Sequence, residues 1–111
     1  MSVSVIIINP ENDKEKQVNV PIATELFFRN QWLPLIKQME LKWLNCFQSG
    51  IEISYEDKDD VIKELEELKK KLLSETKMGD DYLFMIRRID NLIIEIKGIF
   101  DRRKDTILYI G

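Results

Sequence analysis

The pattern of apolar and polar positions divides the chain into four short extended segments and three longer helical ones. Residues 3–8 are rich in β-branched side chains, which is typical of a strand, and residues 17–20 alternate between apolar and polar until Pro21 closes the segment. Turn-forming residues lie between these two segments, so the pattern predicts a β-hairpin with a charged, mobile loop. Residues 51–55 and 106–110 predict a third and a fourth strand.

Apolar side chains recur at steps of three and four along residues 23–48, which predicts the first helical region. Pro34 lies inside this stripe, where it removes a backbone donor and clashes with the preceding turn. The stripe keeps its phase across Pro34, which favours a kinked helix; the alternative is a new helix that carries Pro34 in its first turn. Gly50 fits a C-terminal cap. The stripe consists of Phe28, Trp32, Leu35, Met39, Trp43 and Cys46.

Two further helices are predicted, each with one apolar face. A carboxylate-rich run at 56–60 precedes the periodic apolar positions of 61–73, and negative charge is stabilised at a helix N-terminus. A loop at 77–80 separates this helix from the third, residues 81–103, whose apolar face is the broadest and predicts the most buried helix. The short connection and the shared rhythm of the two helices predict an antiparallel helical hairpin.

The element order is therefore β-β-α-β-α-α-β, which predicts an α+β fold. A small four-stranded, mostly antiparallel sheet with three helices packed on one face would bury every apolar stripe. The chain has 111 residues, of which 44% are hydrophobic, and this is enough apolar material for one core. We therefore expect residues 1–111 to form a single compact α+β domain.

The composition argues against most catalytic chemistry. The chain has no histidine, so the commonest general base and metal ligand are missing, and its single cysteine cannot build a zinc site. No nucleotide-binding or calcium-binding motif occurs. These absences predict a protein that is not an enzyme and has no cofactor. Cys46 alone cannot form an intramolecular disulfide, which fits a cytoplasmic location.

The charge pattern argues against nucleic acid as a partner. The net charge is −3, and lysine and arginine are interleaved with aspartate and glutamate, whereas nucleic-acid binders present a basic face. The apolar segment 3–8 is far too short to cross a membrane. We therefore expect neither nucleic acid nor membrane as a partner.

Three groups of residues are candidates for a binding surface. The acidic run could hold a hard cation such as Mg²⁺ or meet a basic partner surface, although its acids also suit a solvated helix start. A minor stripe on the third helix could form the rim of a partner or dimer contact, or it could be ordinary core. Phe27 and Leu41 fall off the main stripe of the first helix and could form an exposed patch, while Trp32 and Trp43 fit the core. The acidic run is Glu52, Glu56, Asp57, Asp59 and Asp60, and the minor stripe is Leu83, Arg87, Asp90 and Ile94.

These observations favour a small, acidic, non-catalytic module that binds a partner protein. A bacterial or phage inhibitor, such as a toxin-neutralising immunity protein, would have this size, charge and lack of catalytic groups. One alternative is a self-associating structural subunit, a homodimer formed through the third helix. A less favoured alternative is a carboxylate- and metal-dependent enzyme built on the acidic run.

Overall fold

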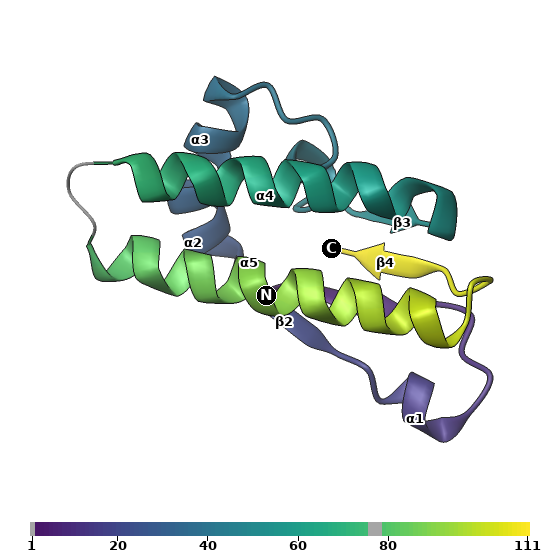
Figure 1. Cartoon of the computed structure of the whole chain (residues 1–111). Coiled ribbons are helices and arrows are strands. Elements are labelled where there is room, and N and C mark those ends of the chain that lie inside the picture. The colour runs from purple at the N-terminus through teal and green to yellow at the C-terminus, as the bar shows by residue number, and fades with distance from the viewer. Residues whose placement is uncertain (1, 76–78) are drawn as a thin grey trace.

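The last strand of the chain pairs in the middle of the sheet. The computed structural model describes residues 2–75 and 79–111. The strands are β1 (Ser2–Ile7), β2 (Val20–Thr24), β3 (Ile51–Ile53) and β4 (Leu108–Ile110). Within the described residues they form one sheet in the order β2-β1-β4-β3, in which all neighbours are antiparallel (Figure 1). This confirms the predicted four-stranded α+β fold.

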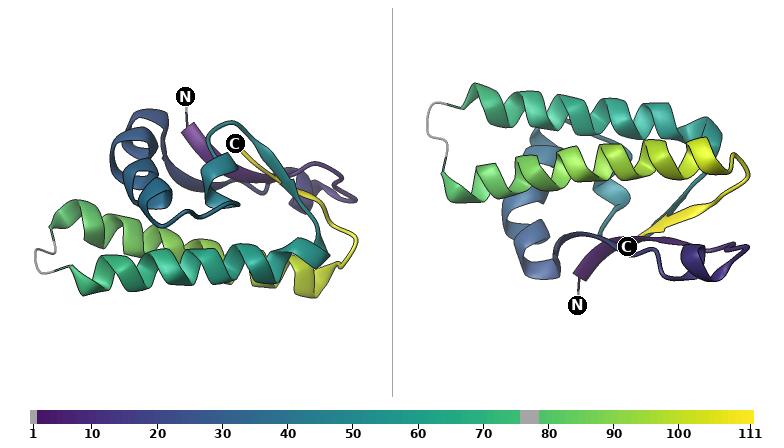
Figure 2. Two further views of the ribbon diagram at one scale, coloured as in Figure 1. Left: turned by 90° about the horizontal axis from the view of Figure 1, so that it is seen from above. Right: turned by 60° about the horizontal axis from the view of Figure 1, so that its bottom comes forward.

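One face of the sheet is apolar and carries the helices. Val3, Val5 and Ile7 of β1 are buried, while the alternate side chains Ser4 and Ile6 are partly or fully exposed. Such alternation is expected for a sheet with only one covered face. Figure 2 shows the two long helices lying together on one side of the sheet.

The two long helices form the predicted antiparallel hairpin. They are α4 (Lys58–Ser74) and α5 (Asp80–Arg102), which lie side by side in both figures, and a Lys69–Asp90 ion pair of 2.7 Å joins them. Of the predicted connection at 77–80, residues 77 and 78 lie outside the described residues, Gly79 precedes α5 and Asp80 is its first residue. Within the described part of the chain, no helix combines the length and the apolar character that crossing a membrane requires. The buried positions of the two helices are Val61, Ile62, Leu65, Leu68, Leu72, Met85, Ile89, Leu92, Ile96, Ile99 and Phe100.

The first helical region passes through Pro34 without a break. Its parts are α2 (Glu25–Phe27), a π-helical turn η1 (Phe28–Trp32) and α3 (Leu33–Gln38). In the π turn the Leu33 N–H donates to the Phe28 carbonyl, so the backbone has widened by one residue just before the proline. Pro34 then lies in the first turn of α3, and the widened turn before it accommodates a residue that has no backbone N–H to donate.

The helix ends earlier than its apolar stripe predicts. Glu40 adopts a left-handed backbone conformation with φ 57°, and the Leu41 N–H donates to the Ile36 carbonyl at 3.1 Å, which closes the helix. A short 3₁₀ turn, η2 (Leu44–Cys46), follows. The prediction of a helix up to residue 48 is therefore wrong.

This early ending shifts which side chains are buried. Leu41, Leu44 and Phe47 are buried, whereas Trp43 and Cys46 are only half-buried. Trp43 packs against the core from this half-buried position, whereas the assignment of Cys46 to the core stripe is wrong. The expectation that Leu41 belongs to an exposed patch is also wrong. The physical reason is that the turn at Glu40 changes the phase of the stripe.

The N-terminal hairpin also differs from its prediction. β2 begins at Val20 and runs through Pro21, which was expected to close the strand. Proline is tolerated because β2 is an edge strand and the register shifts between Val3 and Ser4 on its neighbour. The loop expected to be mobile contains a helical turn, α1 (Asp13–Lys16), that is bonded to Arg103.

The other boundaries follow the sequence more closely. β3 and β4 are shorter than predicted, because Tyr55–Asp57 form a 3₁₀ turn, η3, and the buried hydroxyl of Thr106 donates to the Arg103 carbonyl at 2.8 Å. α5 begins and ends within one residue of the predicted bounds. The long apolar repeat of α5 extends over the whole helix, so its ends are easy to predict.

Candidate functional site

The carboxylates of the predicted acidic run lie on β3, η3 and α4 and have different partners. The Asp57 carboxylate accepts hydrogen bonds from the Ser54 backbone N–H and hydroxyl, which closes a capping box at the 3₁₀ turn η3 that leads into α4. Asp59 pairs with Lys58 at 2.9 Å, while Glu56 and Asp60 are exposed and Glu52 lies on β3. Among residues 2–75 and 79–111, no group of three or more acidic or cysteine side chains is arranged to hold a metal ion. Four of its five carboxylates therefore lie in the turn and the first residues that begin α4, where negative charge is stabilised.

The predicted stripe on α5 lies on the surface. Leu83 and Ile94 are 43% and 66% exposed, so the alternative that they belong to the core is wrong. Arg87 is exposed between them, while Asp90 is held by Lys69 of α4. The stripe is thus available for contact, and its role in binding a partner or a second copy stays a prediction.

A second and more concave apolar surface lies beside this stripe. It is a groove of about 440 Å³ between the edge strand β2, the start of α2 and the N-terminal half of α5. The residues that line it are Ser2, Pro21, Ala23, Thr24, Phe27, Phe84 and Arg88, and we call it the aromatic groove.

The two aromatic rings and the arginine of the aromatic groove contact one another in sequence. The Phe27 and Phe84 rings meet edge to face, with centroids 5.5 Å apart, and the Thr24 hydroxyl fixes Phe27 by accepting its backbone N–H at 3.1 Å. The Arg88 guanidinium lies over the Phe84 ring at 4.8 Å and donates to the Pro21 carbonyl at 3.2 Å. This last bond satisfies a carbonyl on the edge strand and ties α5 to β2.

Sequence reasoning found only part of this groove. It singled out Phe27 as lying off the core stripe but missed Phe84 and Arg88. A signal was present: Phe84 and Arg88 are four residues apart, and both lie to one side of the main apolar face of α5. Nothing local, however, indicates that β2 and α2 complete the other wall.

A third feature is a network of charges between α1 and the C-terminus of α5. The Arg103 guanidinium binds both carboxylate oxygens of Glu15, at 3.1 and 2.8 Å, and donates to the Asn9 carbonyl at 2.7 Å. Glu11 and Asp105 lie 3.3 and 3.0 Å from the same guanidinium. Arg103 directly follows the last residue of α5, and through these bonds it fixes the loop of the N-terminal hairpin.

This network predicts how stability depends on pH. The hydrogen bonds from Arg103 hold the pKa of Glu15 below its ordinary value of 4.5, and Glu15 in turn raises the pKa of Arg103. A carboxyl whose pKa is lowered by folding stabilises the fold above its unfolded pKa, and this contribution is lost as the pH falls through the folded pKa. We therefore expect Glu15→Gln to be less stable than the wild type at pH 7, with a gap that closes below about pH 4.5.

The measurement is the urea midpoint of both proteins from pH 7 to pH 3. Glu66→Gln is the matched control, because Glu66 is exposed and has no ion pair among the described residues. A gap for Glu15→Gln that stays constant over this range would contradict the assignment.

These surfaces have to be interpreted from their own geometry and chemistry. No protein-family model matches the chain, and comparison with curated proteins and with solved structures finds no significant match.

Proposed function

We propose that the protein is a non-catalytic module that binds a partner protein, and that the partner docks in the aromatic groove. The observation that carries this proposal is the Phe27–Phe84 pair, because Phe84 remains 39% exposed although it is held in a fixed orientation. Leu83 and Leu26 add exposed apolar side chains from the two elements that flank the groove. Rigid, partly exposed aromatic side chains in a concave surface are typical of interaction hot spots.

The charges beside the groove indicate the chemistry of the partner. Arg88 on the groove wall and Arg87 next to it have no carboxylate within 4.0 Å among the described residues. The partner segment that fits carries an apolar side chain for the groove and an acidic residue beside it. This differs from the acidic run, for which a basic partner surface stays a prediction.

A role as an inhibitor or an immunity protein remains our working hypothesis for the biological purpose of this binding. It rests on the small size, the acidic charge and the lack of histidine in the sequence. We also propose a cytoplasmic location, since the chain contains a single cysteine and cannot form an intramolecular disulfide.

The test uses two variants with opposite expectations. Phe84→Ser removes the exposed ring from the groove, while Leu73→Ser is the matched control, because Leu73 is 56% exposed on α4 and lies outside the groove. Each variant is used as bait in a lysate of the host. We expect the wild type and Leu73→Ser to recover the same partner protein, and Phe84→Ser to fail to recover it. With that protein purified, calorimetry should show affinity reduced by about 2 kcal/mol, or roughly 30-fold, for Phe84→Ser alone.

Two results would contradict the proposal. One is equal recovery of every protein by all three baits, and the other is no protein that the wild type retains above background. Thermal melting of each variant checks that Phe84→Ser remains cooperatively folded.

The exposure of Leu83 and Ile94 favours self-association as a second candidate function. In that case sedimentation at rising concentration shows a dimer that Leu83→Asp dissociates and Phe84→Ser leaves intact. A wild-type protein that stays monomeric at the highest concentration removes this candidate.

A further inference from the structure

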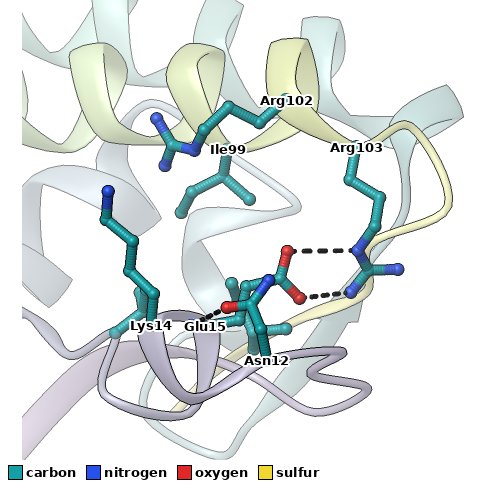
Figure 3. Close-up of a pocket in the computed structure, with 8 residues that line it drawn as sticks. Asn12, Lys14, Glu15, Ile99, Arg102 and Arg103 are labelled. Carbon is teal, nitrogen blue, oxygen red and sulfur yellow. Dashed lines mark hydrogen bonds and ion pairs between the residues drawn. The ribbon is translucent and has the colours of Figure 1, made fainter.

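We propose that a pocket between α1 and the C-terminal end of α5 binds a small organic carboxylate with an apolar body. This site is distinct from the aromatic groove: Phe84 and Ile99, which line the two surfaces, are separated by about 22 Å along α5. The pocket has a volume of about 300 Å³ (Figure 3). Its lining consists of Ile7, Asn12, Lys14, Glu15, Val18, Ile99, Arg102 and Arg103, and we call it the basic pocket.

The basic pocket has an apolar floor. Ile7 and Ile99 are buried in the core, and Val18 packs against it from the end of the α1 segment. These three side chains come from β1, α5 and the hairpin loop, and the Arg103–Glu15 hydrogen bonds hold that loop against the end of α5. An apolar floor favours a ligand that can bury hydrocarbon there.

The rim of the pocket is positively charged in a chain whose net charge is negative. Three cations and one carboxylate line it, and that carboxylate, Glu15, is already bound by Arg103. Lys14 and Arg102 have no carboxylate within 4.0 Å among the described residues, and Figure 3 shows both side chains on the side of the pocket away from the Glu15–Arg103 pair. Two cations without a counter-charge at the mouth of a pocket favour an anionic ligand.

Asn12 adds a neutral hydrogen-bond donor. Its side-chain oxygen accepts the Glu15 backbone N–H at 2.8 Å, which fixes the orientation of the amide. The amide nitrogen is then free of any hydrogen bond to the described residues. A carboxylate held by Lys14 and Arg102 can accept from this group, whereas a cation cannot.

The size of the pocket sets the size of the ligand. A volume of about 300 Å³ lies at the lower end of the range of pockets that bind small molecules. A carboxylate with a short aliphatic or aromatic body has this size and both required properties. Inorganic phosphate supplies the charge without the apolar body, and an alcohol of the same length supplies the body without the charge.

The experiment is a titration with octanoate, followed by calorimetry and by ¹⁵N amide shifts. We expect saturable binding at low salt, with shifts that centre on Val18 and Ile99 and spare Phe27 and Phe84. Octanol and phosphate should each bind at least tenfold more weakly than octanoate. Lys14→Gln and Arg102→Gln should each weaken the affinity for octanoate about tenfold, since each removes one charge-assisted hydrogen bond.

Lys97→Gln is the matched control, because Lys97 is an exposed lysine on the same helix outside the pocket lining. Its affinity for octanoate should equal that of the wild type. The proposal is overturned if octanoate does not saturate, if octanol binds equally well, or if the shifts map to the aromatic groove. An equal loss of octanoate affinity in Lys97→Gln and Arg102→Gln would also overturn it. The attraction of octanoate would then come from the overall positive charge of the surface and not from the basic pocket.

Discussion

Replacement of Trp32 by alanine is expected to lower the free energy of unfolding by about 3–5 kcal/mol. Trp32 is fully buried and stacks on Phe28, with ring centroids 5.5 Å apart, at the point where the π turn joins α3. Alanine leaves a cavity there that the surrounding helices and sheet can only partly fill. Urea denaturation followed by circular dichroism measures the loss, and Trp43 remains as a fluorescent reporter.

Trp32→Phe is expected to have a smaller effect, below about 2 kcal/mol. The indole nitrogen of Trp32 is buried and has no hydrogen-bond partner among the described residues, so phenylalanine removes an unsatisfied donor as well as apolar volume. Leu26→Ala is the control, since Leu26 is 62% exposed in the same helical region and should change stability by no more than about 0.5 kcal/mol. An equal loss for the alanine and phenylalanine variants would contradict this account of the core.

Replacement of Glu64 by alanine is expected to lower stability by about 2–3 kcal/mol. The Glu64 carboxylate accepts the backbone N–H groups of Lys42, Trp43 and Leu44 at 3.0, 2.9 and 3.1 Å, respectively. These three N–H groups lie at the start of the 3₁₀ turn η2, where they would otherwise have no acceptor. Their loss should weaken the turn and the burial of Leu44.

Hydrogen exchange of these three amides is the most direct measurement. Protection should fall at Lys42, Trp43 and Leu44 in Glu64→Ala, and fall less in Glu64→Gln, whose side-chain oxygen still accepts but carries no charge. Glu67→Ala is the control, because Glu67 is exposed one turn later on α4 and its side chain makes no hydrogen bond to the described residues. Unchanged exchange in Glu64→Ala would show that the turn forms without this carboxylate.

The first helical region shows why apolar periodicity is an incomplete guide. Its stripe continues at steps of three and four up to Cys46, so nothing in the spacing indicates that the helix ends at Gln38. The ending depends on Glu40 in a left-handed conformation and on Glu64, which reaches the next turn from a different helix. A contact between residues 21 positions apart has no trace in a local pattern.

The candidate sites divide in the same way. The acidic run and the α5 stripe are contiguous in sequence or share one helix face, and such groups are easy to find. The aromatic groove and the basic pocket draw their residues from separate elements: Arg88 meets Pro21, and Arg103 meets Glu15, which lies 88 positions away. Neither pairing follows from composition or spacing.

The sequence by itself determined the α+β class, the helical hairpin and the bounds of α5, because each depends on local propensity and a long apolar repeat. The tertiary structure decided the strand order, the end of the first helix and the walls of both concave surfaces. The physical reason is that local rules fix which face of an element is apolar, while packing between distant elements decides where charged and aromatic side chains meet.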